Sequence, residues 1–259
     1  MTQEEEFPAR CWDDLRTRME STGAEAVIEY VQGFDDPAER RKLYVFCQHA
    51  FGQREWKGKN LDGRSAVVQA GIAEGLRQAE AESDPEVANK LLDFANVLSY
   101  NLSADLAECW PTDVEPRERR HFELGLEAAE NCLRWRRELG KGPFPFSIAY
   151  WARGMHQISL GQHEAAVGSM ELALENARKA AETEAGGGPV ELHESFGLAI
   201  STGYLGIARR LAGDGEGRAL YEEACAAFEQ MGGRDDLQPD ANFGLGQLRH
   251  VWSRYGEAS

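Results

Sequence analysis

The chain has 259 residues, a length that allows one large domain or two ordinary ones. Of these residues 42% are hydrophobic and 28% are charged, a composition that excludes a disordered protein. Asp and Glu number 44 against 28 Lys and Arg, and the resulting net charge of -16 excludes a general binder of nucleic acid or of anionic membranes. The five cysteines are scattered and form no CxxC pair, so reduced thiols and a cytoplasmic location are expected.

Helical periodicity, capping residues and Gly or Pro breaks predict an all-α protein, because no stretch alternates as a strand does. We expect a flexible acidic tail over 1–8 and a single domain over 9–255. Within that domain we expect N-terminal helices over 9–36, stacked helical hairpins over 37–231 and a C-terminal capping helix over 240–255. The main helices are expected over about 9–21, 23–32, 38–51, 64–82, 85–110, 115–139, 164–184, 190–211, 218–231 and 240–255.

A DDxxE motif at Asp35–Glu39 has two interpretations. Paired carboxylates at this spacing are typical of a magnesium site. The same residues also form a helix start, with Asp36 as N-cap, Pro37 at the first position and Glu39 closing a capping box. We favour the helix start.

The stretch Ser147–Glu175 has the pattern of a helical hairpin. Gly161 falls between two amphipathic runs, where a left-handed residue ends one helix and permits a reversal. Ala166 and Ala173 lie seven positions apart, so they share the face that looks toward the first helix. With Gly154 on that first helix, these small residues predict a close approach of the two helices.

The pattern recurs along the chain. Gly154 and Gly161 have counterparts at Gly206 and Gly213, 52 positions later in each case, and a weaker copy comprises Leu91, Phe94, Ala95 and Leu98. These residues resemble the tetratricopeptide repeat (TPR), over about 37–255. The resemblance implies antiparallel hairpins stacked as an α-solenoid, a TPR-like superhelix that works as a non-enzymatic scaffold for protein–protein interaction.

The chain departs from the TPR pattern in several respects. Its period is 52 residues where the family repeats about every 34. Arg178 stands where the family usually has a proline, and Gln157 and Arg209 stand where it prefers apolar residues. These departures indicate a divergent relative, and an unrelated array of helical hairpins is the alternative.

The resemblance places a partner-binding groove on the first helices of the repeats. Of the implied positions only Asn96 matches the family's carboxylate clamp, so an apolar groove for a protein or peptide, such as an amphipathic helix, is expected. Burial of this face beneath neighbouring helices and self-association into a homo-oligomer are the alternatives. The groove positions are Leu92, Asn96, Tyr100, Trp151, Met155, Ile158, Ile200, Ile207 and Arg210.

Arginines gather in the segment 115–139 and form a second candidate surface. In an acidic chain such a cluster is suited to an anion or an acidic partner. Pairing with carboxylates of the same chain is the alternative. The patch comprises Arg117, Arg120, Arg134 and Arg137.

No motif for catalysis, a cofactor or a metal is complete. His163-Glu164 and His193-Glu194 begin like HExxH, but Val167 and Gly197 stand where the second histidine is required. The sequence therefore predicts no catalytic residue, no cofactor and no metal. A helical metal-dependent enzyme that uses the acidic pairs or His156 is the remaining alternative.

Overall fold

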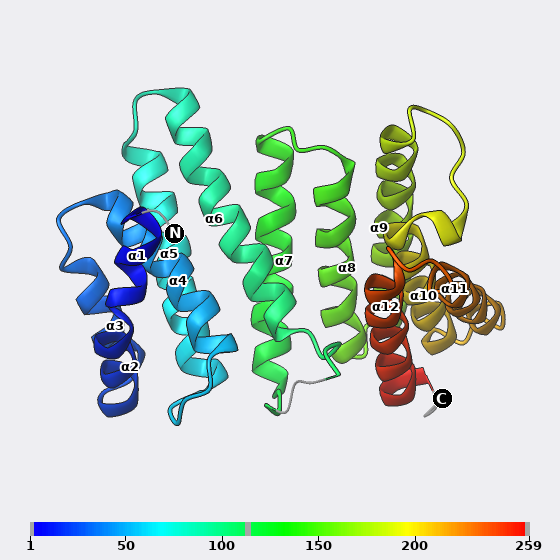
Figure 1. Cartoon of the computed structure of the whole chain (residues 1–259), viewed down its shortest axis with the longest axis horizontal. Helices are drawn as coiled ribbons and strands as arrows, with labels where there is room; N and C mark the ends of the chain where they lie inside the picture. The colour runs from blue at the N-terminus through cyan, green and yellow to red at the C-terminus, as the bar shows by residue number, and fades with distance from the viewer. Residues whose placement is uncertain (1–2, 112–114, 257–259) are drawn as a thin grey trace. The chain divides into compact units, whose positions relative to one another are not determined.

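The computed structural model describes residues 3–111 and 115–256, and these residues form helices with no strand among them (Figure 1). The helices pack mainly against their neighbours in the sequence, so the expected all-α class is confirmed. They are α1 (Gln3–Arg10), α2 (Trp12–Ser21), α3 (Ala24–Gln32), α4 (Pro37–Gln53), α5 (Leu61–Ala81), α6 (Pro85–Leu106), α7 (Arg119–Glu138), α8 (Pro143–Ser159), α9 (His163–Glu184), α10 (Phe196–Leu211), α11 (Gly217–Met231) and α12 (Gln238–Val251). A 3-10 turn, η1 (Leu192–Glu194), precedes α10, and a π-helical turn, η2 (Trp252–Gly256), follows α12.

The chain divides into two compact units, Met1–Leu102 and Ser103–Ser259, and the boundary falls within α6. We refer to them as unit 1 and unit 2. The segment 9–255, for which we expected a single domain, is divided between these two units. In the described part of the chain no helix is both long enough and apolar enough to cross a membrane.

Residues 3–8, which belong to the expected acidic tail, are helical. Helix α1 occupies Gln3–Arg10, and the ring of Phe7 packs edge-on against Phe34 with 5.7 Å between the centroids. Pro8 is buried, and Cys11 lies within hydrogen-bond distance of the Phe7 carbonyl. Two apolar side chains thus anchor this acidic segment, which charge alone did not indicate.

The DDxxE motif acts as the start of α4. Asp36 Oδ1 accepts a hydrogen bond of 2.8 Å from the backbone N–H of Ala38, and Pro37 occupies the first turn, where its missing N–H costs nothing. The expectation of a helix start at Asp36 is confirmed.

Helix α7 begins four residues later than expected, at Arg119. The His121 ring, through Nδ1, accepts a 2.9 Å hydrogen bond from the backbone N–H of Glu118, which fixes the first turn there. Pro116 disfavours a helical conformation for Glu115 just before it. Arg117 therefore lies in the connection between α6 and α7.

The turns of the two repeated hairpins have the same geometry. Gly161 has φ +75° and Gly213 has φ +83°, so both occupy the left-handed region that favours glycine. The next residue in each turn closes the helix end: Gln162 N–H donates to Gln157 O at 2.8 Å, and Asp214 N–H donates to Arg209 O at 2.9 Å. This is a Schellman motif in both cases, so the predicted turns are confirmed.

The small residues in the hairpins allow the helices to approach closely. A Cβ on Gly154 would lie 2.7 Å from Met170 Cε, and one on Gly206 would lie 2.7 Å from the carbonyl oxygen of Gly217. Ala166 and Ala173 are fully buried on α9, as predicted. The helix pairs α8/α9 and α10/α11 thus repeat one packing solution within unit 2.

Candidate functional site

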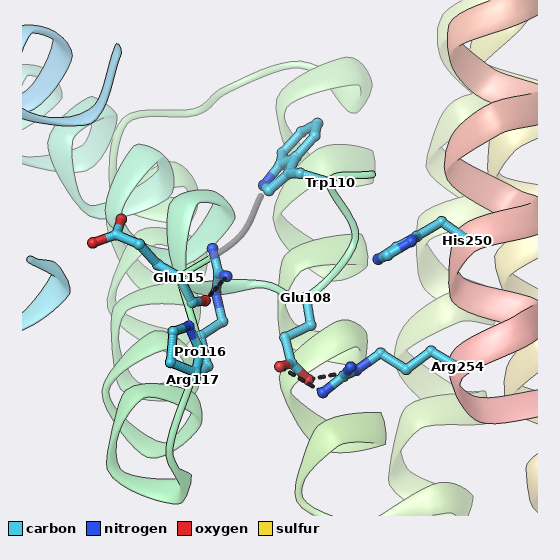
Figure 2. A pocket seen from close by; sticks show the side chains of 7 residues that line it. All are labelled: Glu108, Trp110, Glu115, Pro116, Arg117, His250 and Arg254. Carbon is cyan, nitrogen blue, oxygen red and sulfur yellow. Dashed lines mark hydrogen bonds and ion pairs between the residues drawn. The ribbon is translucent and has the colours of Figure 1, made fainter. Parts of the chain in front are cut away.

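A pocket of about 250 Å³ lies in unit 2 and is lined by two distant parts of the sequence (Figure 2). The segment between α6 and α7 contributes two carboxylates, an indole and a guanidinium. Helix α12 and the turn η2 contribute a histidine and a second guanidinium. The lining residues are Glu108, Trp110, Glu115, Pro116, Arg117, His250 and Arg254.

One ion pair joins the two sides of this pocket. Arg254 donates from Nη2 to Glu108 Oε1 at 2.7 Å and from Nε to Glu108 Oε2 at 2.8 Å, which is a bidentate arrangement (Figure 2). The Glu108 side chain is 11% exposed and that of Arg254 is 48% exposed. Nη1 of Arg254 has no hydrogen-bond partner among the described residues, so it remains available to a ligand.

The neighbouring tyrosine reinforces this pair. Tyr255 OH donates to Glu108 Oε2 at 2.7 Å and lies 2.9 Å from Ser159 Oγ at the end of α8. Its hydrogen bonding, together with Glu108, raises the pKa of Arg254, and burial raises the pKa of Tyr255. The side chains of Arg254 and Tyr255 therefore anchor the π-helical turn η2 to Glu108, and Tyr255 also anchors it to Ser159.

Arg117 is positioned by backbone carbonyl groups. Its Nη2 donates to Asp105 O at 2.7 Å. Its Nη1 donates to Glu115 O at 3.1 Å (Figure 2). These bonds hold the Arg117 guanidinium beside the pocket. In Figure 2 His250 and Arg254 project from the same helical segment toward the segment that carries Glu108.

An aromatic surface continues from the pocket. Trp110 donates from Nε1 to Ala104 O at 3.0 Å, and its ring lies 6.1 Å from the ring of Phe243. Phe243 is 51% exposed and stacks on Phe196 at 6.3 Å. A polar pocket and an accessible apolar surface are thus contiguous.

The predicted groove is largely covered. Met155 and Ile207 are fully buried and Ile158 is 2% exposed, all three in the core of unit 2. Helix α8 packs against α7, α9 and α10, while α10 packs against α9, α11, α12 and η2. The groove prediction is therefore wrong for these residues, because neighbouring helices cover the face that the resemblance left open.

The other groove positions have mixed surroundings. Trp151 and Ile200 are half-buried and pack against the core of unit 2, and Arg210 is half-buried on α10. Leu92, Asn96 and Tyr100 lie on α6 within unit 1, where Asn96 is 2% exposed and donates to Asp93 at 2.9 Å. Asn96 is therefore not available to clamp a partner.

The four arginines of the predicted patch have four different surroundings. Arg117 lines the pocket, and Arg120 pairs with Glu118 at 3.4 Å. Arg134 lies over the ring of Trp135 at 5.5 Å, and Arg137 donates from Nη2 to Tyr150 OH at 3.2 Å. Intramolecular pairing with a carboxylate thus accounts for Arg120.

Among residues 3–111 and 115–256, no group of three or more His, Cys, Asp or Glu side chains could hold a metal ion. His156, the histidine named in the enzyme alternative, is fully buried and bonds to Ser103. A buried imidazole at this position cannot reach a substrate in the described arrangement.

Sequence reasoning missed Glu108, Trp110, His250 and Arg254. Glu108 and Arg254 are 146 positions apart, and each stands beyond a long helix in a segment without a recognisable motif. The only local signal was Trp110 followed by Pro111, an aromatic residue at a helix end, which does not distinguish a pocket from a core.

The pocket of unit 2 and the adjacent aromatic rings are the basis for a functional assignment. Comparison of the chain with protein-family models, with curated proteins and with solved structures found no match.

Proposed function

We propose that this chain is a non-enzymatic peptide-binding module whose recognition site is the pocket of unit 2 together with the adjacent rings of Trp110 and Phe243. A hydrogen-bond-accepting group of the peptide binds Arg254 in the pocket. The apolar side chain next to that group packs on the two rings. The TPR-like stacking of hairpins provides the rigid frame, and the expected cytoplasmic location and α-solenoid shape belong to the same proposal.

The proposal rests on the fixed orientation of the Arg254 guanidinium and on its Nη1, which is unbonded in the part of the chain that the structure describes. Its guanidinium is fixed on one edge by Glu108 and by nearby Tyr255, while Nη1 has no partner in the described chain. A donor that is already oriented loses little conformational entropy when a ligand binds, so it contributes more of its hydrogen-bond energy to affinity.

The composition of the surface supports a peptide as the ligand. Trp, Tyr and Arg are the residue types that most often dominate the energy of protein interfaces, and here they lie together beside an exposed phenylalanine. The lining has two carboxylates and two guanidiniums, so it offers donors and acceptors in balance. Such a site orients a polar group rather than attracting a polyanion.

The proposal is tested by selecting binders from a displayed library of random peptides on the wild-type chain. Affinity of the selected peptides is then measured by fluorescence polarisation for the wild type, Arg254→Gln, Trp110→Ala and Arg249→Gln. Arg249 is the matched control, because it lies near the end of α12, five residues before Arg254, is exposed and pairs with Glu229 at 3.0 Å outside the pocket.

We expect Arg254→Gln and Trp110→Ala each to weaken binding by about tenfold or more, and Arg249→Gln to leave it unchanged. Enrichment of no peptide, or equal affinity for wild type and Arg254→Gln, would contradict the proposal. A concentration-dependent dimer in light scattering that Phe243→Ser abolishes would favour the homo-oligomer alternative.

A further inference from the structure

Two arginines and a tyrosine form a cluster on the α7/α8 hairpin that the pocket does not include. Arg137 in the last turn of α7 donates from Nη2 to Tyr150 OH at 3.2 Å. Arg153, one turn further along α8, places its guanidinium carbon 5.0 Å from the centroid of the Tyr150 ring. We call Arg137, Tyr150 and Arg153 the arginine clamp.

Neither arginine of the clamp has an acidic partner in the part of the chain that the structure describes. No carboxylate oxygen there lies within 4.0 Å of the nitrogens of Arg137 or Arg153. This contrasts with Arg40, Arg209 and Arg254, each of which forms at least one ion pair. Other arginines, such as Arg134 and Arg178, also have no ion pair among the described residues, but Arg137 and Arg153 share one tyrosine and so place two positive charges side by side.

The electrostatic surroundings of Arg153 are unfavourable as they stand. Burial lowers the pKa of Arg153, and the positive charge of Arg137 lowers it further. Tyr150 and the more distant carboxylate of Glu130 act in the opposite direction without reversing the shift. An anion bound between the two guanidiniums would remove this repulsion.

Arg153 is also oriented before any ligand arrives. Its Nε donates to Ser169 Oγ at 2.9 Å, and Ser169 in turn donates to Gln157 Oε1 at 2.5 Å. Ser169 is 1% exposed and Gln157 is 9% exposed, so this chain of bonds is anchored in the interior. Nη1 and Nη2 of Arg153 make no hydrogen bond within the described residues, and Tyr150 OH, which accepts from Arg137, keeps its own proton to donate.

We propose that the arginine clamp binds the phosphoryl dianion of a phosphorylated peptide, with both guanidiniums and the Tyr150 hydroxyl as donors. The two positive charges match a phosphate monoester, which carries nearly two negative charges at neutral pH. Guanidiniums are the preferred donors to phosphate because they present paired N–H groups in a plane. A single carboxylate would neutralise only one of the two charges.

The rest of the chain indicates a local anion on a peptide rather than an extended polyanion. With net charge -16, the chain as a whole repels nucleic acid and anionic lipid surfaces. A single phosphoryl group on a neutral peptide does not experience this repulsion to the same degree. The clamp is independent of the pocket proposed above, since none of its residues lines that pocket.

The test uses NMR signals of the arginine Nε–H groups in the full chain. The probes are a short neutral peptide with one phosphoserine, the same peptide with Ser or Glu at that position, and inorganic phosphate. The variants are Arg137→Gln, Arg153→Gln and the matched control Arg178→Gln, which removes one exposed arginine of α9 that makes no hydrogen bond or ion pair in the described chain. Arg137 is exposed, so Arg137→Gln is expected to fold normally, and thermal unfolding checks all three variants.

We expect the phosphoserine peptide to shift the signals of Arg137 and Arg153, and each clamp variant to weaken binding by about tenfold while Arg178→Gln does not. The Ser and Glu peptides are expected to bind about tenfold more weakly than the phosphoserine peptide. Equal losses for Arg137→Gln and Arg178→Gln, or no shift with any probe, would overturn the proposal. Inorganic phosphate binding as tightly as the phosphopeptide would show that the clamp takes the free anion, and would overturn the assignment to a peptide.

Discussion

The imidazole ring of His156 on α8 occupies the space that a side chain at Gly125 on α7 would need, and a Cβ built on Gly125 would overlap this ring. His156 Nε2 lies 2.9 Å from Ser103 O and 3.1 Å from Ser103 Oγ, while Ser103 Oγ donates to Gly125 O at 2.8 Å. Since the Ser103 carbonyl can only accept, Nε2 carries the proton. The last turn of α6 therefore meets α7 and α8 at one ordered contact.

Replacing Gly125 by alanine is expected to destabilise the protein by about 1–3 kcal/mol, because a fully buried, hydrogen-bonded ring cannot move aside freely. Gly168 on α9 is the control: a Cβ there meets nothing within 4 Å, so Gly168→Ala is expected to stabilise by up to about 1 kcal/mol through helix propensity. Urea unfolding of both variants measures the difference. Equal effects would mean that α7 and α8 are not in close contact at His156.

The pH dependence of stability follows from the same histidine. Burial lowers the pKa of His156 to about 4, since its Nδ1 has no hydrogen-bond partner in the described chain and would carry the added proton. The unfolded chain binds this proton near pH 6.5, so between about pH 6.5 and 4 the unfolded state holds more protons than the folded state. Stability is therefore lost as the pH falls through this window, by an amount on the order of 3 kcal/mol.

The His156→Gln variant isolates this contribution. Its unfolding free energy, measured by urea titration at intervals from pH 7 to 4, is expected to decline less than that of the wild type. The ring signals of His156 in NMR spectra are expected not to titrate between pH 8 and 5. A midpoint near 6.5 would show that the ring is accessible to water.

Glu74 in unit 1 is the carboxylate that accepts the hydrogen bonds of a largely buried polar cluster. Burial alone would raise its pKa, but hydrogen bonds from Arg77, Arg40 and Gln78 outweigh this effect and hold the pKa below its usual value. The side chains of Glu74 and Arg40 are 7% and 13% exposed, and their atoms approach to 2.6 Å.

Glu74→Gln is expected to destabilise the protein by about 3 kcal/mol, because Arg40 remains buried without its counter-charge. Glu80→Gln, at an exposed position of the same helix, is expected to change stability by less than about 0.5 kcal/mol. Thermal and urea unfolding at pH 7 compare the two. If both variants were as stable as the wild type, the cluster would contribute no more than a surface ion pair.

Tyr255 holds the π-helical turn at the end of α12. Tyr255→Phe removes the bond to Glu108 and the contact with Ser159, so we expect a loss of about 1 kcal/mol and faster hydrogen exchange of the amides in η2. Tyr30→Phe, which removes an exposed 3.4 Å bond to Asp14 in unit 1, is the control and should leave this exchange unchanged. Unaltered exchange in Tyr255→Phe would assign the order of the turn to packing of Trp252, which stacks on Tyr221 at 4.1 Å.

The sequence by itself determined the helical class, the starts and ends of several helices, and the repeated hairpins. The cap at Asp36 and the turns at Gly161 and Gly213 involve bonds between residues no more than five apart. Such bonds depend on local side-chain chemistry and on the freedom of glycine to adopt positive φ. Residue type and spacing are therefore sufficient to predict them.

Only the tertiary structure decided which apolar faces are covered and which polar groups meet. The resemblance to the tetratricopeptide repeat placed Met155 and Ile207 on an apolar face, but an apolar face in the sequence does not show whether a partner or another helix covers it. The pairing of Glu108 with Arg254 and the placement of Arg153 beside Arg137 join separate elements of the chain. These contacts depend on how the helices pack in space, and no local spacing rule encodes that packing.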